Sequence, residues 1–164
     1  MKAIVAMDLN RTIGNKGKLP WPKIKEDMAF FKEMTYWNRL IMGRKTFDSV
    51  GVLPNRYTYV LSREHKNKQL ICHSAAYINM DEAKLVDTYE YSIDRPTEAF
   101  VCGGAEVYKQ LLPFCTDVYV THVLDEYEGD TFMPAFEDEF SNQELLRETK
   151  DFWIVRYSKP FLKL

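Results

Sequence analysis

The chain has 164 residues, 46% of them hydrophobic and 28% charged, which is typical of one globular domain with a sizeable core. Its formal charge of −2 gives no reason to expect nucleic acid or an acidic membrane as a partner. No apolar run is long enough to span a membrane, and residues 3–7 are too short for a signal-peptide core. We therefore expect a single cytoplasmic domain over residues 1–164, beginning at Met1 and, at this size, monomeric.

Short β-rich runs alternate with helical patterns along the chain. The patterns predict strands at 2–7, 39–43, 56–62, 99–104 and 117–123, and helices at 24–36, 44–50 and 105–112. Residues 144–164 predict two or three antiparallel strands. This alternation favours an α/β fold: a mainly parallel central sheet flanked by helices, with an antiparallel C-terminal hairpin at one edge.

Two segments, residues 64–98 and 125–148, are harder to interpret. Residues 70–73 are consistent with a short strand, and residues 79–89 with a helix whose N-cap is Asn79 and whose capping box is completed by Glu82. Residues 125–148 are acidic, and we interpret them as a solvated, loop-like surface.

Cysteine and histidine residues give no sign of a disulfide framework or a metal site. The three cysteines (Cys72, Cys102 and Cys115) are odd in number and have no CxxC spacing, so we expect reduced thiols. The three histidines (His65, His73 and His122) show no metal-ligand spacing. We therefore expect no bound metal.

Three predicted strands end in residues suited to binding phosphate. These ends are Gly43 to Thr46, Ser62-Arg63, and Gly103-Gly104. Ligands of parallel sheets bind outside the carboxyl ends of the strands, where glycine permits close backbone approach and a following helix start presents free N–H groups. Two such junctions suit one pyrophosphate, and the basic Arg44, Lys45 and Arg63 suit a further phosphate. This pattern fits NADPH better than NADH.

One carboxylate stands out in the predicted helix over residues 24–36. Ile24, Asp27, Met28 and Phe31 share one stripe of that helix, where an apolar residue would be usual in place of Asp27. The alternative is a helix position turned to solvent, a role for which the neighbouring Glu26, off the stripe, is the better candidate. From the residues alone, the two interpretations of Asp27 are evenly balanced.

The chain resembles the dihydrofolate reductase family of bacterial type. The resemblance rests on "IGNKGKLPWPKIKEDMAFFKEMT", followed in order by "IMGRKTFDSV", "LPNR", "YVLSR", "CGGAEVYKQLLP", "VYVTHV" and "EGDTFMP". It covers nearly the whole chain, and the set is specific where any single piece would be weak. The resemblance implies reduction of 7,8-dihydrofolate to 5,6,7,8-tetrahydrofolate by NADPH, in the one-carbon metabolism that antifolates target.

The resemblance also implies catalytic roles. Asp27 would manage the proton that reaches the pterin ring, directly or through a water, and an apolar cleft would raise its pKa. Thr121 would share its hydrogen bonds, and Trp21 would belong to a loop that closes over the site. Arg56 would pair with the α-carboxylate of the glutamate tail.

The implied substrate pocket comprises Ile4, Val5, Ala6, Leu19, Asp27, Met28, Phe31, Lys32, Val50, Leu53, Arg56, Cys102, Tyr108 and Thr121. The implied NADPH site comprises Ala6, Ile13, Gly14, Gly17, Lys18, Leu19, Gly43, Arg44, Lys45, Thr46, Leu61, Ser62, Arg63, Cys102, Gly103, Gly104, Ala105, Glu106, Val107 and Tyr108.

Three alternatives remain at this point. A same-fold reductase of another heterocycle, such as a pyrimidine of the riboflavin pathway, would lack the block that contains Trp21, Asp27 and Phe31. A non-catalytic NADP-binding module would not need Asp27 or Arg56. A purely structural domain would not explain a carboxylate on an apolar stripe beside three phosphate-suited strand ends.

Overall fold

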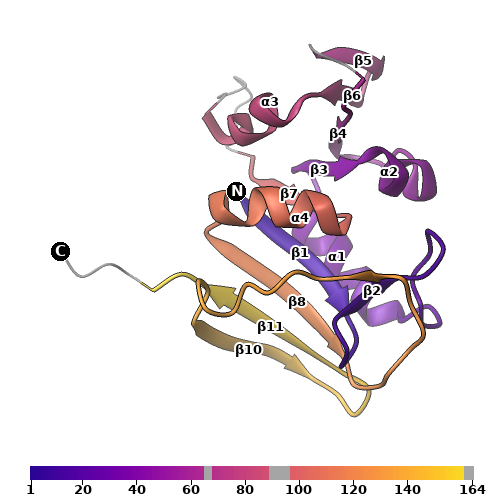
Figure 1. The fold of residues 1–164 in the computed structure, drawn as a ribbon, viewed down its shortest axis with the longest axis vertical. Coiled ribbons are helices and arrows are strands. Elements are labelled where there is room, and N and C mark those ends of the chain that lie inside the picture. The colour runs from indigo at the N-terminus through magenta and orange to yellow at the C-terminus, as the bar shows by residue number, and fades with distance from the viewer. Residues whose placement is uncertain (65–67, 89–96, 161–164) are drawn as a thin grey trace.

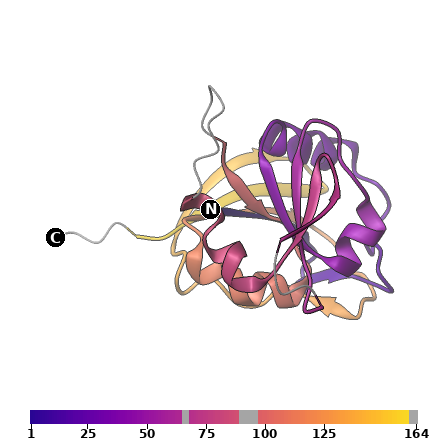
Figure 2. The same cartoon turned by 90° about the horizontal axis from the view of Figure 1, so that it is seen from above.

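A nine-stranded sheet organises residues 1–64, 68–88 and 97–160, which are the residues that the computed structural model describes (Figure 1). In spatial order its strands are β10 (Asn142–Glu148), β11 (Phe152–Ser158), β8 (Asp117–Val123), β1 (Lys2–Met7), β7 (Ala99–Val101), β3 (Arg39–Gly43), β4 (Tyr57–Leu61), β6 (Ala75–Ile78) and β5 (Gln69–Cys72). Figure 2 looks along this sheet from the β5 edge.

The six strands from β8 to β6 are mutually parallel, and antiparallel strands lie at both edges. At one edge β11 and β10 form the C-terminal hairpin; at the other, β5 pairs antiparallel with β6. The predicted α/β fold with a mainly parallel sheet and a C-terminal hairpin is therefore confirmed. The strand predicted around residues 70–73 also exists, as β5.

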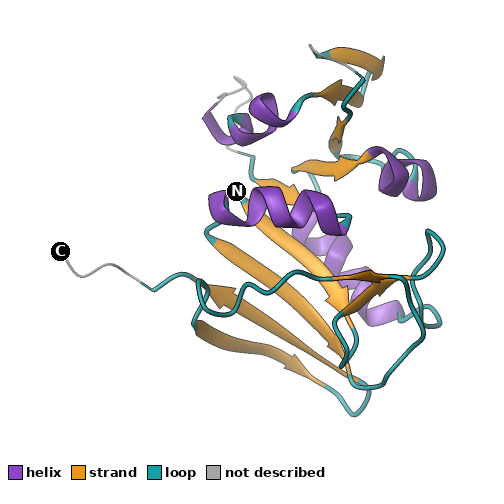
Figure 3. Ribbon diagram, viewed as in Figure 1, coloured by secondary structure: helices purple, strands orange, loops and turns teal. Residues whose placement is uncertain are grey.

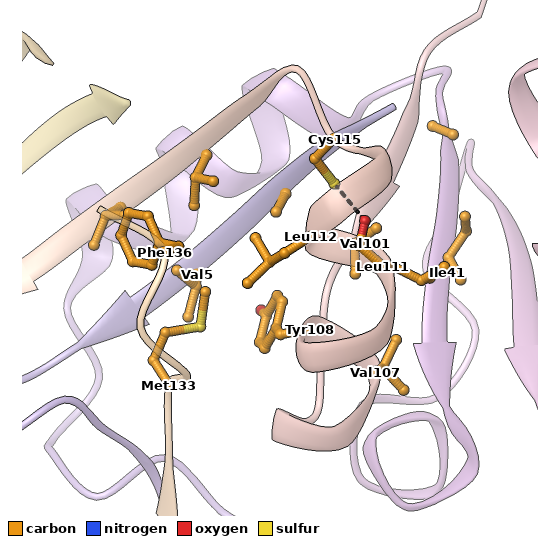
Figure 4. Close-up of a cluster of buried hydrophobic side chains, with 14 of the residues drawn as sticks. Val5, Ile41, Val101, Val107, Tyr108, Leu111, Leu112, Cys115, Met133 and Phe136 are labelled. Carbon is orange, nitrogen blue, oxygen red and sulfur yellow. Dashed lines mark hydrogen bonds between the residues drawn. The ribbon is translucent and has the colours of Figure 1, made fainter. Parts of the chain in front are cut away.

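Helices cover both faces of the sheet (Figure 3). Helices α3 (Met80–Lys84) and α4 (Ala105–Leu111) contribute to a cluster with Val5, Ile41 and Val120, drawn in part in Figure 4. Helices α1 (Lys25–Thr35) and α2 (Arg44–Val50), with the turns that follow them, pack against the opposite face, near Ile4 and Leu40. The alternation of neighbouring residues such as Ile4 and Val5 between the two clusters follows from the two-residue period of a strand. No helix in the described ranges is long and apolar enough to cross a membrane.

The N-cap predicted in the irregular segment is confirmed. Asn79 accepts a hydrogen bond from the backbone of Glu82, and the Glu82 side chain accepts one from the backbone of Asn79. The helix is shorter than predicted: α3 ends at Lys84, a 3₁₀ turn covers Val86–Thr88, and Tyr89 lies outside the described residues.

The interpretation of residues 125–148 as a solvated loop is only partly right: most of the segment is exposed, but it contains two strands and three buried side chains. Strand β9 (Thr131–Phe132) pairs with β2 (Thr12–Gly14), and residues 142–148 form β10. Met133, Phe136 and Phe140 are at most 4% exposed and belong to the core beside α4. The acidic residues around them face solvent, so the charged composition of the segment concealed three buried anchors.

Asp8, directly after β1, connects that strand to the two-stranded ribbon formed by β2 and β9. It is 2% exposed, and its Oδ1 accepts from the backbone N–H groups of Asn10 (2.9 Å) and Thr12 (2.8 Å). Its Oδ2 accepts from the backbone of Tyr127 (2.8 Å). Among the described residues no cation lies within salt-bridge distance of Asp8, so backbone amides alone solvate this carboxylate.

Candidate active site

A cleft of about 1980 Å³ opens at the carboxyl ends of β1, β3, β4 and β7. Of the residues predicted for substrate and cofactor, all but Thr121 line this cleft. Trp21, predicted to be catalytic, does not line it; it is 6% exposed and its ring meets Tyr127 edge-on at 5.9 Å. The sequence positions that seemed scattered are thus brought together by the parallel order of the strands.

Asp27 lies in the first turn of α1, and its carboxylate reaches across to β8. Thr121 Oγ1 donates to Asp27 Oδ1 over 2.6 Å, and Thr121 itself is 3% exposed. Burial raises the pKa of Asp27, and the hydrogen bond from Thr121 offsets part of that rise. The cleft therefore contains one half-buried carboxyl group that takes up a proton more readily than an exposed aspartate.

The wall around Asp27 is apolar and partly open. Met28 and Val50 remain 45% and 46% exposed, although both are apolar, because they face the cleft from α1 and α2. Phe31 and Leu53 are half-buried beside them. An open wall of this kind suits a ligand with a flat apolar body.

Tyr108 is a buried residue of the cleft lining. Its hydroxyl donates to the Ile4 carbonyl over 2.7 Å, and the side chain is 3% exposed. Burial raises the pKa of Tyr108 well above its ordinary value, so the phenol stays neutral and remains a donor. Cys102, also beside the cleft, has a thiol whose pKa is raised by burial, and its Sγ donates to the Phe100 carbonyl over 3.4 Å.

Arg56 also lines the cleft, beside the ring of Tyr36. It is 8% exposed, and its guanidinium donates from Nε to Pro54 (3.0 Å) and from Nη1 to Thr35 Oγ1 (3.1 Å). Burial lowers the pKa of Arg56, although an arginine remains charged at neutral pH. No carboxylate of the described residues forms a salt bridge with it. The site thus holds a fixed, nearly buried cation with donors to spare.

The glycine junctions that follow β3 and β7 lie side by side. Gly43 N donates to the Gly103 carbonyl over 2.8 Å, and Gly103 has φ of +108°, a conformation that favours glycine. A Cβ on Gly43 would meet Val107 at 3.3 Å, so a larger residue would fill the junction. Helices α2 and α4 begin immediately after these junctions.

Basic side chains surround the junctions. Lys45 and Arg63 are exposed and line the cleft, and Arg44 Nη1 donates to Glu64 Oε1 over 2.8 Å. The close backbone junctions and these three basic residues together suit a phosphate-bearing dinucleotide.

The loop that carries Leu19 is tethered on two sides. Asn15 and Lys18 exchange backbone hydrogen bonds, and Lys16 N donates to Asp130 Oδ2 over 3.0 Å. Ser49 Oγ, on α2, donates to the Gly17 carbonyl over 3.0 Å. This loop therefore spans the mouth of the cleft between α2 and the β9 ribbon.

Sequence reasoning missed eleven cleft-lining residues: Lys16, Lys23, Lys25, Ala29, Met42, Ser49, Glu64, Met80, Gln110, Asp130 and Thr131. Most of them flank a predicted position by one or two residues along the chain. Asp130 and Thr131 lie in the "EGDTFMP" piece of the family resemblance, but no site role was assigned to them, because their segment was interpreted as a surface loop. Among the described residues no group of histidine, cysteine, aspartate and glutamate is arranged to hold a metal ion.

Comparison with known proteins agrees with this geometry. The family model described as "Dihydrofolate reductase" matches residues 1–153. The dihydrofolate reductase of Bacillus subtilis (strain 168) is 37% identical over 155 residues, which are 90% of this chain and 84% of the relative. That of Haemophilus influenzae is 39% identical over 132 residues, 80% of this chain and 76% of the relative.

A solved structure shares the fold as well. The structure of dihydrofolate reductase from Enterococcus faecalis, complexed with NADP(H) and RAB-propyl, superposes with a TM-score of 0.76 at 32% identity. The match covers 96% of this chain and 95% of that one. With a family match over most of its length and relatives above one-third identity, the chain belongs to the dihydrofolate reductase family.

Proposed function

We propose that the cleft reduces 7,8-dihydrofolate to 5,6,7,8-tetrahydrofolate with NADPH, and that Asp27 manages the proton of this reaction. The family membership makes the chain an NADPH-dependent dihydrofolate reductase. The observation that carries the role of Asp27 is its position as a half-buried carboxyl group, held by Thr121 at 2.6 Å, in a cleft with an apolar wall. The riboflavin-pathway and non-catalytic alternatives gain no support from the comparisons.

Asp27 orients the pterin and raises the proton affinity of the site. A carboxylate accepts two hydrogen bonds side by side, which matches the amino and ring N–H donors of a pterin edge. Because burial favours the protonated carboxyl group, Asp27 also supports delivery of a proton to the ring nitrogen, either itself or through water. Thr121 is a positioning residue that fixes one carboxylate oxygen.

The apolar wall and Arg56 divide the rest of the substrate between them. Met28, Phe31 and Val50 pack against the flat rings, and the nearly buried Arg56 guanidinium pairs with the α-carboxylate of the glutamate tail. Lys32, which also lines the cleft, adds positive charge at the same end.

The strand-end junctions hold the cofactor. NADPH, when bound, supplies the hydride. Gly43, Gly103 and Gly104 permit close approach of the pyrophosphate to the backbone, while Arg44 and Arg63 pair with the additional phosphate. The loop around Leu19 excludes water from the path between the two rings, and Trp21, buried against Tyr127, packs outside the cleft lining. We further propose that the chain acts as a monomeric single domain in the cytoplasm.

The decisive experiment is NADPH oxidation with dihydrofolate across pH, for the wild type, Asp27→Asn and a control, Glu26→Gln. Glu26 is an exposed glutamate in the same helical turn, so its variant is expected to follow the wild type. We expect Asp27→Asn to be crippled near neutral pH and to recover partly in acid, where the substrate arrives protonated. Equal turnover by Asp27→Asn and the wild type would contradict the role of Asp27. Absence of turnover by the wild type would remove the substrate assignment.

A further inference from the structure

Glu64 lines the cleft but has no role in the proposed binding of the pterin or in the strand-end junctions proposed to hold the cofactor. It lies three residues beyond β4, next to Arg63, and its carboxylate accepts the hydrogen bond from Arg44 at 2.8 Å. Its own backbone N–H donates to Ser62 Oγ over 3.2 Å, which keeps this turn close to the strand end. The Glu64 carboxylate thus binds Arg44, on which the proposed cofactor site depends for pairing with the additional phosphate.

The sheet register explains why these residues meet. Strands β3 and β4 pair in parallel, with Gly43 opposite Leu61, so Arg44 and Ser62 are the first residues beyond two neighbouring strand ends. Arg44 Nη1 and the Glu64 carboxylate are both exposed to solvent, at 47% and 67% for the two side chains. The contact is therefore at the rim of the cleft and can exchange with a ligand without unpacking the core.

The charge of a ligand determines how readily it replaces Glu64 at Arg44. A phosphate ester that binds Arg44 competes with Glu64 for the guanidinium and remains beside a carboxylate of the same sign. A ribose with a free 2′-hydroxyl meets no such repulsion, because a hydroxyl donates to a carboxylate, as acidic residues do in NAD-binding sites. Asp48, one turn along α2, also acts on Arg44 through space, but the hydrogen bond comes from Glu64.

We propose that Glu64 is a specificity-determining residue that weakens the preference of this enzyme for NADPH over NADH by competing for Arg44 and repelling the 2′-phosphate. This inference rests on the proposed function, in which Arg44 and Arg63 read that phosphate. It concerns only the ratio between the two cofactors and leaves the chemistry of the pterin pocket unchanged.

The test is a binding titration rather than a rate. Dissociation constants for NADPH and NADH are measured by protein fluorescence, without dihydrofolate, for the wild type and Glu64→Gln. We expect Glu64→Gln to raise the ratio of the NADH constant to the NADPH constant by about two- to fivefold, the range that exposed charge pairs produce. The increase should shrink in high salt, because exposed charges are screened.

The matched control is Asp81→Asn. Asp81 forms an exposed ion pair with Lys84 outside the cleft lining, so its variant makes the same change of charge and should leave the ratio unaltered. An unchanged ratio in Glu64→Gln, or weaker NADPH binding, would overturn the inference while the proposed function stands. If the wild type bound neither cofactor, the proposed function itself would fail.

Discussion

Arg56 offers the most direct test of how the cleft holds the tail of its substrate. We expect Arg56→Met to weaken binding of dihydrofolate, because methionine keeps much of the apolar stem and removes the charge. The guanidinium is fixed in advance by Pro54 and Thr35, so little ordering is required of it when a carboxylate binds. A hydrogen-bonded pair with a charged group is worth about 1.5–3 kcal/mol, which corresponds to roughly 10- to 150-fold in the dissociation constant.

The assay compares two ligands and three variants. Dissociation constants are measured for dihydrofolate and for a pterin that lacks the aminobenzoylglutamate tail. Arg56→Met should weaken only the first, and Arg56→Lys should recover part of the loss, because lysine restores the charge without the planar fork. Arg63→Met, the same change at an exposed cleft arginine near the strand-end junctions, should leave both constants unaltered.

Two results would refute the reasoning. Dihydrofolate binding within twofold of the wild type in Arg56→Met would show that Arg56 does not contact the tail. An equal loss for both ligands would show that Arg56, which is only 8% exposed, acts through the architecture of the pocket.

Three other predictions concern stability and the cofactor. Burial raises the pKa of Asp27, so its ionisation opposes folding; Asp27→Asn should raise the free energy of unfolding at pH 7, and denaturant titrations should show the gain shrinking as the pH falls through the raised pKa of the folded state and absent below about 4, the pKa of an unfolded aspartate. Phe140→Ala should cost about 3–5 kcal/mol in the same assay, because the ring is 1% exposed, whereas Phe132→Ala, 50% exposed, should cost at most about 1 kcal/mol. Similar losses for the two would contradict the core role of residues 133–140. Arg44→Ala combined with Arg63→Ala should raise the Michaelis constant for NADPH and leave that for NADH nearly unchanged; equal effects would mean that the arginines do not read the extra phosphate.

The parallel core of the fold was predictable from local patterns. The strands at 2–7, 39–43 and 117–123 were predicted with the bounds that the structure has. The first two are largely apolar runs that stop at Asp8 and at Gly43, and the third shows the two-residue alternation of a strand. The short strands β2, β6 and β9 were not predicted, because two to four residues are too few to show a period.

The strand at 99–104 was predicted too long. It ends at Val101, and Cys102 to Gly104 turn into the cleft instead. The buried Phe136 and Phe140 were missed because they lie in a turn and not in a helix or strand. The Phe140 N–H donates to the Phe136 carbonyl over 3.0 Å.

The candidate site divides in the same way. That Gly43 and Gly103 would meet followed from the rule that ligands bind at the carboxyl ends of parallel strands. That Asp27 on α1 would reach Thr121 on β8 depended on tertiary packing across 94 positions of the chain, and only the family resemblance indicated it. The contacts of Ser49 with Gly17 and of Glu64 with Arg44 could not be predicted for the same reason. Each joins two segments at the rim of the cleft that are distant in sequence, and local sequence patterns do not show that such segments meet.

Because the contacts of the Asp8 carboxylate are insensitive to salt, ionic strength can be used to change ligand binding at the cleft without changing the fold around Asp8. Its three partners are amide dipoles of the main chain, short-range contacts inside the protein that dissolved salt scarcely reaches. The exposed basic groups at the rim of the cleft are fully open to counterions. Raising the salt concentration should therefore weaken the binding of anionic ligands while the hydrogen bonds of Asp8 stay intact. Salt titrations would then separate the electrostatic contribution to ligand binding from the effect of the fold, without any mutation.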